Sequence, residues 1–256
     1  MQLNEKTAFI TGAASGLGLA AAKRFVAEGV NVLMFDLDAG RVEAEAQALG
    51  DSAAWAAGDV SDEGQVQAAI DKALQHFGAI HINVNSAGIG SAGKTVGRDG
   101  AMPLDQFNRI IRVNLIGTFN VLRLCAATMS KQAPVNSDNE RGVIINVASV
   151  AAYDGQMGQA AYSASKGGIV SMTLPIARDL ARDGIRVMTV APGIFSTPLM
   201  EASPQPVKDA LVDMIQFPKR MGIPDEFGAM AVHIAQCAYL NGEVIRLDAG
   251  IRMSAR

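Results

Sequence analysis

Short apolar runs alternate with longer segments of helical period along the chain. The runs are rich in Val and Ile and five to eight residues long, which is typical of strands buried on both faces of a parallel sheet. The segments between them, such as 17–29 and 63–78, close on a glycine, a residue that often ends a helix. This alternation predicts βαβ units and an α/β fold with a doubly wound parallel sheet. The expected strands occupy residues 7–11, 31–35, 81–85, 142–149, 185–192 and 242–248.

The alternation is interrupted in three places. Residues 89–103 and 130–142 lack a regular apolar period, and we expect surface loops there. Residues 194–224 are longer and rich in proline, which favours a substrate lid at about 194–224 because long structured loops often cover sites. No internal repeat or low-complexity linker divides the chain, so one domain over residues 1–256 is favoured over two.

Composition narrows the class of protein. Apolar residues make up 49% of the chain, charged residues 18%, and 26 residues are glycine, values typical of a compact globular protein. The net charge of −3 gives no general attraction to nucleic acid or to an anionic membrane. We therefore expect no nucleic-acid partner and no membrane partner.

The N-terminal residues and the two cysteines bear on the cellular location of the protein. Residues 1–12 lead directly into the first expected strand without the charged and apolar regions of a signal peptide. Cys125 and Cys237 lie far apart in apolar surroundings, which suits reduced thiols better than a disulfide, although a bridge remains an alternative. These features favour a soluble cytoplasmic protein.

A glycine-rich turn follows the first expected strand. Gly12, Gly16 and Gly18 stand where the first helix begins, and bare backbone there lets a pyrophosphate approach the helix N-terminus. The spacing differs from the usual G-x-G-x-x-G, so the glycines alone are a weak signal. Asp36 ends the second strand, where a carboxylate can bind both hydroxyls of an adenosine ribose. With Phe35 and Leu37 beside it, this carboxylate favours NAD over NADP; the alternative is an Asp that caps the next helix.

A second glycine-rich stretch matches the sequence pattern of a phosphate-binding loop. Residues 88–95 match G-x-x-x-x-G-K-[ST], which taken alone indicates an ATPase or a kinase. Such a loop must lead into a helix, whereas residues 96–103 contain two glycines and a proline. We interpret the match as accidental.

A tyrosine and a lysine four residues apart are the main catalytic candidates. On a helix, Tyr162 and Lys166 share one face, and a nearby ammonium lowers the pKa of a phenol, which makes it a usable acid and base. Ser149 ends an apolar run, so its hydroxyl is expected near the same site. Singly, each has an alternative interpretation: a core tyrosine, a solvated lysine and a serine that closes a strand.

Histidine gives no sign of a metal site. The three histidines, at positions 76, 81 and 233, are scattered without ligand spacing. We therefore expect no catalytic metal.

Taken together, these motifs resemble the short-chain dehydrogenase/reductase family over nearly the whole chain. The matching motifs are "TGAASGLG" (11–18), "GDV" (58–60), "NSAG" (85–88), "VNLIGTFNV" (113–121), Ser149, "YSASK" (162–166) and "APGIFSTPL" (191–199). The resemblance implies a Rossmann-type fold that binds NAD.

The resemblance also implies a role for each catalytic residue. Tyr162 would be the acid and base, and Lys166 would lower its pKa and bind the nicotinamide ribose. Ser149 would orient the substrate carbonyl. Asn114 would hold a water that relays protons toward Lys166.

Cofactor contacts follow from the same resemblance. Ser86 stands where many members carry a second Asn, a departure that we expect to change little. The implied contacts are Ser15 and Leu17 with the pyrophosphate, Asp59 and Val60 with the adenine, Ser86, Ala87 and Gly88 with the ribose region, and Phe195 and Thr197 with the carboxamide end.

Within the family, residues 141–181, 184–199 and 240–253 are similar to the type 2 3-hydroxyacyl-CoA dehydrogenase group, also described as 17-beta-hydroxysteroid dehydrogenase type 10. The group implies an NAD-dependent homotetramer that interconverts 3-hydroxyacyl-CoA and 3-oxoacyl-CoA thioesters. Gln156 would contact substrate, and Lys219 and Arg220 are candidates for contacts with CoA phosphates or are simply solvated. The mitochondrial address of animal members is missing, which favours a bacterial cytoplasmic protein.

Two alternatives to this function remain. One is an NAD-linked hydroxysteroid or other secondary-alcohol dehydrogenase on the same fold. The other is a non-catalytic NAD-sensing protein, which the joint presence of Ser149, Tyr162 and Lys166 disfavours.

Overall fold

The computed structural model describes residues 1–90, 92–201 and 204–255. Its centre is a seven-stranded parallel sheet in the order β3-β2-β1-β4-β7-β8-β9. The strands are β1 (Thr7–Thr11), β2 (Asn31–Asp36), β3 (Ala53–Ala57), β4 (Ile82–Asn85), β7 (Gly142–Val147), β8 (Ile185–Pro192) and β9 (Val244–Leu247).

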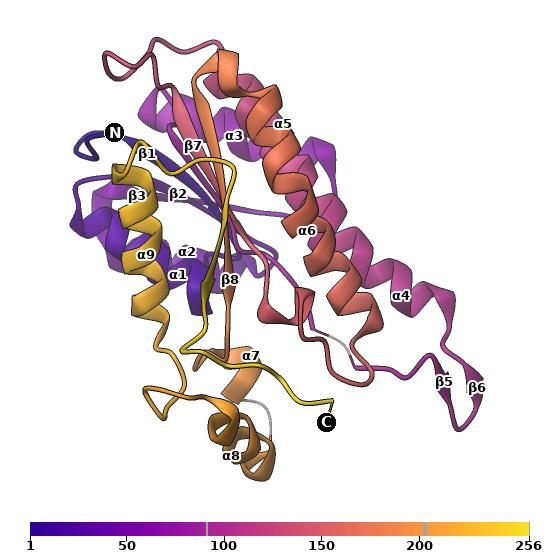
Figure 1. The fold of residues 1–256 in the computed structure, drawn as a ribbon. Helices are drawn as coiled ribbons and strands as arrows, with labels where there is room; N and C mark the ends of the chain where they lie inside the picture. The colour runs from indigo at the N-terminus through magenta and orange to yellow at the C-terminus, as the bar shows by residue number, and fades with distance from the viewer. Residues whose placement is uncertain (91, 202–203, 256) are drawn as a thin grey trace.

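Helices cover both faces of this sheet (Figure 1). One apolar layer joins the sheet to α1 (Gly16–Ala27), α2 (Ala39–Leu49) and α9 (Pro224–Gln236). The layer on the other face joins it to α3 (Glu63–Phe77), α5 (Gly117–Met129) and α6 (Ala160–Asp179). The α/β, doubly wound, single-domain prediction is therefore confirmed.

The remaining helical elements lie at the edges of these layers. A π-helical turn (Arg112–Ile116) joins α4 (Leu104–Ile111) to α5. The others are α7 (Pro198–Glu201), α8 (Gln205–Met214) and short 3₁₀ turns at Gly50–Ser52, Val150–Ala152 and Ala181–Asp183.

Alternation along the central strands explains the two layers. In β1, Ala8 and Ile10 face the α1 layer whereas Phe9 faces the α3 layer, and all three are fully buried. The expected helix ends are also found, because Gly29 and Gly78 follow α1 and α3 with positive φ angles of 78° and 80°.

The order of the strands locates a crevice. Chain order runs outward from β1 toward β3 on one side and from β4 toward β9 on the other. At such a switch point the loops after neighbouring strands separate, and a ligand site forms beyond their carboxyl ends.

Several boundaries differ from those expected. β3 was not predicted, because its sequence, AAWAA, is mostly alanine, which has a low strand propensity. Residues 89–103 are not wholly a loop, since β5 (Val96–Gly97) pairs with β6 (Gly100–Ala101). The strand expected over 142–149 ends at Val147, because Ser149 begins a 3₁₀ turn.

Residues 194–224 follow β8 and lead through α7 and α8 to the start of α9 (Figure 1). Phe195 forms a parallel bridge with Gly222, so the two ends of the segment lie side by side. Residues 202 and 203 of the expected lid lie outside the described residues. The lid assignment stays a prediction.

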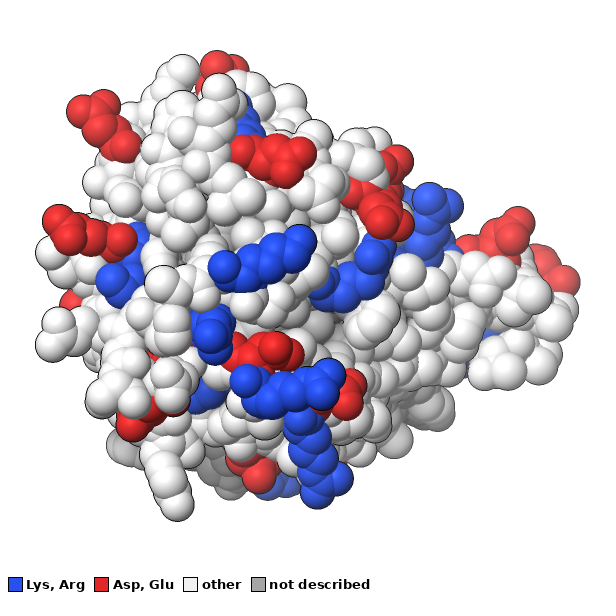
Figure 2. Space-filling view, turned by 90° about the horizontal axis from the view of Figure 1, so that it is seen from above, with Lys and Arg blue, Asp and Glu red and all other residues white. Residues whose placement is uncertain are grey.

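Surface charge and apolar helices bear on partners. The face seen in Figure 2 carries Lys and Arg interspersed with Asp and Glu. Among the described residues, one helical stretch, Leu104–Met129, is long and apolar enough to span a membrane, but half of its apolar window is buried. It packs against α3 and the sheet, as a core helix does.

Both cysteines are free thiols. Cys125 is fully buried in α5, and Cys237 is half-buried just after α9. The expectation of reduced cysteines therefore agrees with the structure.

Candidate active site

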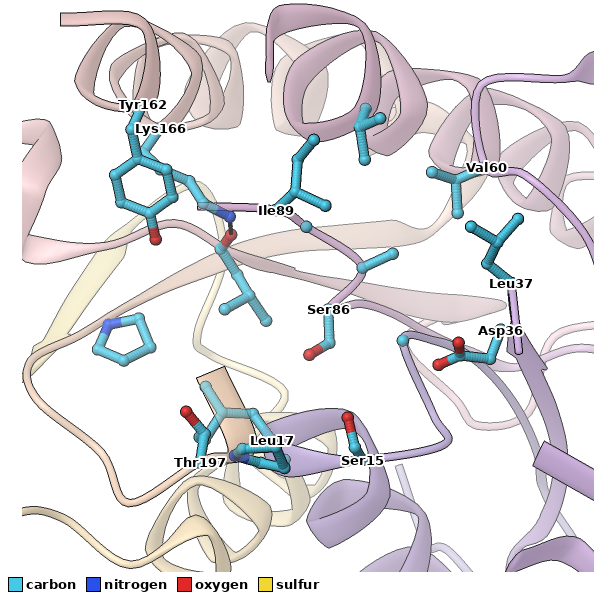
Figure 3. A pocket seen from close by; sticks show the side chains of 18 of the residues that line it. Ser15, Leu17, Asp36, Leu37, Val60, Ser86, Ile89, Tyr162, Lys166 and Thr197 are labelled. Atoms are coloured by element: carbon cyan, nitrogen blue, oxygen red, sulfur yellow. Dashed lines mark hydrogen bonds between the residues drawn. The ribbon is translucent and has the colours of Figure 1, made fainter. Parts of the chain in front are cut away.

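A cleft of about 670 Å³ opens at the switch point between β1 and β4. Figure 3 shows Asp36 at one end of it and Tyr162 with Lys166 at the other. The predicted residues that line the cleft are Gly12, Ser15, Leu17, Asp36, Asp59, Val60, Ser86, Ala87, Gly88, Tyr162, Lys166, Phe195 and Thr197. Gly18, Asn114, Ser149 and Gln156 are not among its lining residues.

The glycine turn forms the floor of the cleft. Gly12 has a φ of 62°, and a Cβ there would come within 2.9 Å of the Ala87 backbone. A Cβ on Gly18 would lie 2.2 Å from the Gly12 carbonyl oxygen, so Gly18 lets the helix approach the strand rather than contacting a ligand. Ser15 is the N-cap of α1, and its side chain makes no capping hydrogen bond. The backbone N–H groups of the first turn are therefore available to an anion.

Asp36 is held at the rim by backbone donors. The backbone N–H of Ala14 donates to Asp36 Oδ2 at 3.0 Å, and that of Asp38 donates to Oδ1 at 3.2 Å. Asp38, and not Asp36, caps α2 through the N–H of Arg41. The alternative role of Asp36 as a helix cap is thus taken by its neighbour.

The wall beside Asp36 is made by the loop after β3. The Asp59 carboxylate accepts hydrogen bonds from the backbone N–H and the hydroxyl of Ser61, both at 2.8 Å. Val60 is buried, and a Cβ on Gly117 would come within 2.6 Å of it. The side chain of Asp59 is therefore committed to its own loop.

Two arginines also line the cleft, and sequence reasoning missed them. Arg109 and Arg112 come from α4 and the π-helical turn, and Arg112 Nε donates to Ser61 Oγ at 3.1 Å. They lie more than seventy residues beyond Asp36 in the chain, so only the fold brings them into the same cleft.

The loop after β4 crosses the middle of the cleft. The backbone N–H groups of Ser86 and Ala87 both donate to Thr11 Oγ1 at 3.1 Å. A Cβ on Gly88 would lie 3.4 Å from Asn114 Oδ1 and 3.5 Å from Lys166 Nζ. The loop is fixed through its backbone, so the serine at position 86 does not disturb its course.

Tyr162 and Lys166 project from α6 into the same end of the cavity (Figure 3). Lys166 is buried, its Nζ donates to the Val147 carbonyl oxygen at 2.8 Å, and the same atom lies 5.9 Å from the centroid of the Tyr162 ring. One turn of helix therefore places the phenol and the ammonium together, as their spacing predicts.

Burial controls the protonation of both groups. It lowers the pKa of Lys166 to about 8 and raises the pKa of Tyr162, while a hydrogen bond from Ser149 lowers that of Tyr162 in part. The expected acidification of Tyr162 by Lys166 is thus not found in the protein alone. The reason is that desolvation dominates the pKa of the phenol, while Lys166 Nζ is turned toward the Val147 carbonyl.

Ser149 contacts Tyr162 at this end of the site, although it does not line the cleft itself. It follows β7 and caps the 3₁₀ turn Val150–Ala152, and its Oγ accepts a hydrogen bond from the Ala151 N–H at 3.1 Å. Because Oγ accepts from the backbone, its own hydrogen is free to be donated toward Tyr162 or a substrate oxygen. Ser149, Tyr162 and Lys166 thus converge as predicted.

Asn114 is fully buried in the π-helical turn. Its Oδ1 accepts from the Ile89 N–H at 2.8 Å, and its Nδ2 donates to the Ile89 carbonyl at 3.0 Å and to Ser165 Oγ at 3.1 Å. One amide hydrogen therefore fixes the loop at Ile89, and the other is donated to Ser165 on α6. The implied water relay stays a prediction and would have to use the main-chain carbonyl, which accepts from Thr118 Oγ1.

The expected carboxamide contacts lie opposite the glycine turn. Phe195 is buried, and Thr197 Cγ2 lies 3.5 Å from the position of a Cβ on Gly16. The first residues of the 194–224 segment therefore close the cleft over the start of α1.

Three further residues expected to contact the substrate or its CoA phosphates do not line this cleft. Gln156 lies outside the cleft, where its Nε2 donates to the Ser254 carbonyl at 3.3 Å. Arg220 forms a two-fold ion pair with Glu226, and Lys219 donates to the Asp213 carbonyl. Arg220 is thus committed to a carboxylate rather than presented to a phosphate.

The segment that matches the phosphate-binding pattern, residues 88–95, is followed by a strand and not by a helix. Residues 92–94 are irregular and the chain continues into β5 at Val96; Ser91 lies outside the described residues. The interpretation of this match as accidental agrees with the structure. Among the described residues, no group of three His, Cys, Asp or Glu side chains is placed to hold a metal ion.

Comparison with known proteins identifies the family. The short chain dehydrogenase model matches residues 6–208. The chain belongs to the short chain dehydrogenase family. It is therefore an oxidoreductase, and its cleft is that of a nicotinamide-dependent enzyme.

Individual relatives cover the whole chain. It is 53% identical to 3-hydroxyacyl-CoA dehydrogenase type-2 of Bos taurus over 96% of this chain and 95% of the relative. The same enzyme of Drosophila melanogaster is 46% identical over 98% and 99%. The crystal structure of 3-hydroxyacyl-CoA dehydrogenase type-2 from Mycobacterium avium superposes with a TM-score of 0.95 at 39% identity, covering 100% and 99%. That of a 3-ketoacyl-(acyl-carrier-protein) reductase from Brucella melitensis complexed with NADH gives 0.86 at 32% identity, covering 98% and 100%.

Proposed function

We propose that this protein is an NAD-dependent dehydrogenase that interconverts 3-hydroxyacyl-CoA and 3-oxoacyl-CoA. The observation that carries the proposal is one continuous cleft with Asp36 at one end and Tyr162 beside Lys166 at the other. The thioester is supported by relatives named 3-hydroxyacyl-CoA dehydrogenase type-2 that are 46% to 53% identical.

The cleft fits a dinucleotide along its length. Ser15, Gly16 and Leu17 line the cleft at the N-terminus of α1, where no side chain caps the first backbone N–H groups, which suits a pyrophosphate. Asp36 would hold the adenosine ribose and Lys166 the nicotinamide ribose. A bound nicotinamide supplies the acceptor and donor of hydride.

The proton transfer is carried out by side chains of the protein itself. In the oxidative direction Ser149 holds the alcohol oxygen at C3, and Tyr162 takes the hydroxyl proton as the C3–H bond breaks and the C=O bond forms. In the reverse direction Tyr162 returns that proton to the ketone oxygen. Lys166 is buried beside Tyr162, so its charge would be weakly screened and would stabilise the phenolate between the two steps.

Asp36 should set the choice of NAD over NADP. Its carboxylate would accept ribose hydroxyls and repel a 2′-phosphate, whereas Arg112, which lines the cleft and contacts Ser61, would attract one. Asp36→Ala is therefore expected to shift the ratio of kcat/KM for NAD to that for NADP by roughly 10- to 100-fold toward NADP, since charged hydrogen bonds contribute about 1.5–3 kcal/mol.

Asp38→Ala is the matched control for this measurement. Asp38 lies two residues away and caps α2 without lining the cleft, so the control should cost stability and leave the ratio unchanged. An Asp36→Ala enzyme that keeps the wild-type preference would refute the assignment.

The substrate is tested with acetoacetyl-CoA and NADH, followed at the nicotinamide absorbance. Wild type should turn over and should prefer 3-oxoacyl thioesters to a steroid ketone or a simple ketone. Turnover of the steroid alone would support the hydroxysteroid alternative. Binding of NADH without turnover of any carbonyl would support the NAD-sensing alternative.

Assembly and location belong to the same proposal. Three large apolar side chains remain exposed on α5 and α6 or next to α5 in the chain: Phe119 of α5, Ile116 just before α5 and Leu174 of α6. They are suited to burial between subunits of a homotetramer. Light scattering is expected to give a mass about four times that of one chain; a monomer would contradict this. Cytoplasmic location is proposed as well, and fractionation of the source cells tests it.

A further inference from the structure

Arg246 on β9, an edge strand of the sheet, is the centre of a charged cluster. Its Nη2 donates to Asp154 Oδ2 at 2.8 Å and to the Ile251 carbonyl at 3.1 Å, and its Nε donates to Asp248 Oδ2 at 2.7 Å. The guanidinium also lies 5.0 Å from the centroid of the Tyr153 ring. The arginine is thus held from several directions, and its side chain is only 22% exposed.

The partner Asp154 belongs to the turn that begins at Ser149. The backbone N–H of Asp154 donates to the Val150 carbonyl at 2.9 Å, and Ser149 caps the same turn. The residues after this turn, 155–159, lead directly into α6 and Tyr162. A contact that fixes Asp154 therefore fixes the link between the serine and the tyrosine.

The C-terminal segment supports the same link. Figure 1 shows it running from β9 past α7 and α8. Ile251 is buried with Val150 and with Ile215, which follows α8, and the Ala255 carbonyl accepts from the Met157 N–H at 3.0 Å. The turn after Ser149 is therefore anchored to the edge of the sheet rather than left as a free surface loop.

We propose that Arg246 is a positioning residue for Ser149, acting through Asp154 and the turn 150–154. The inference rests on the proposed function, in which Ser149 must hold the substrate oxygen in line with Tyr162. The Arg246–Asp154 ion pair joins residues that are 92 apart in the chain. In this proposal the ion pair affects catalysis, whereas exposed surface ion pairs generally contribute little.

The test compares Arg246→Met with wild type in acetoacetyl-CoA reduction. Displacement of the serine should lower kcat roughly 10- to 100-fold, because small misplacements of reacting groups are costly. The dissociation constant for NADH, measured by fluorescence, should stay unchanged, since the cofactor end of the cleft is untouched. Arg246→Lys, which keeps one charged contact, should recover part of kcat.

Asp154→Asn is the second, gentler variant, and it should lower kcat in the same way. The double variant should be no slower than the slower single one, because both break one link. The matched control is Arg24→Met, which removes an exposed ion pair with Asp225 between α1 and α9 and should keep wild-type kcat.

Two results would overturn the proposal. One is wild-type kcat in both Arg246→Met and Asp154→Asn; the other is a loss of NADH binding that matches the loss of turnover, which would mean general damage. If wild type itself fails on acetoacetyl-CoA, the proposed function fails instead, and the same variants are compared on whichever alcohol it oxidises.

Discussion

Replacing Tyr162 with phenylalanine is expected to lower kcat for acetoacetyl-CoA reduction by roughly 10³-fold, within the range that a positioned acid and base contributes. The ring remains, so packing against α6 and the cleft is retained, and only the hydroxyl that accepts from Ser149 is lost. NADH binding, followed by fluorescence, should be nearly unchanged. Steady-state kinetics and a binding titration on the same preparation measure both quantities.

Tyr239→Phe is the matched control for this variant. Tyr239 is fully exposed and far from α6 in the chain, so the loss of its hydroxyl should leave kcat at the wild-type value. If Tyr162→Phe also retained wild-type kcat, the proton would have to come from another group, and Tyr162 would not be the acid.

Removal of the Lys166 charge has the second large effect. Lys166→Met should lower kcat/KM by roughly 10²- to 10³-fold, as expected for loss of a preorganised charge beside the reacting oxygen. Unlike the tyrosine variant, it should also weaken dinucleotide binding, because Lys166 is expected to hold the nicotinamide ribose. Lys131→Met, at an exposed lysine beyond α5, is the control and should change neither quantity.

Lys166→Met is also expected to differ from wild type in how its free energy of unfolding depends on pH. The pKa of Lys166 in the folded protein is about 8, against 10.5 for an ordinary lysine, so the folded state binds fewer protons than the unfolded state between these values. The stability of wild type relative to Lys166→Met should therefore rise by about 3 kcal/mol between about pH 7 and about pH 11. Urea denaturation across this range measures it; a flat or falling difference would contradict the burial of a charged Lys166.

Local patterns were sufficient for much of the fold and of the site. Strands such as Ile185–Pro192 are continuous apolar runs and need no information from elsewhere in the chain. The glycine turn and the Tyr162–Lys166 pair depend on spacings of two to six residues within one element or one turn, which sequence displays directly. These features were therefore found where they were expected.

What sequence could not supply depends on contacts between distant segments. β3 is an alanine-rich strand that forms because Val32 to Asp36 offer it a partner. Arg109 and Arg112 line the cleft only because distant segments pack together, and Arg246 meets Asp154 across 92 residues. The raised pKa of Tyr162 likewise reflects burial, which a spacing of four residues does not reveal.

The central claim is that Tyr162 becomes an effective acid and base in the cofactor complex, although burial alone raises its pKa above 10. Ultraviolet titration of tyrosinate in wild type minus that in Tyr162→Phe isolates this one phenol among three tyrosines. Without NAD the difference should titrate above pH 10, and with NAD⁺ it should titrate below pH 10, because the positive charge of the nicotinamide then lies beside the phenol. A titration that stays above pH 10 in the NAD⁺ complex would contradict the account.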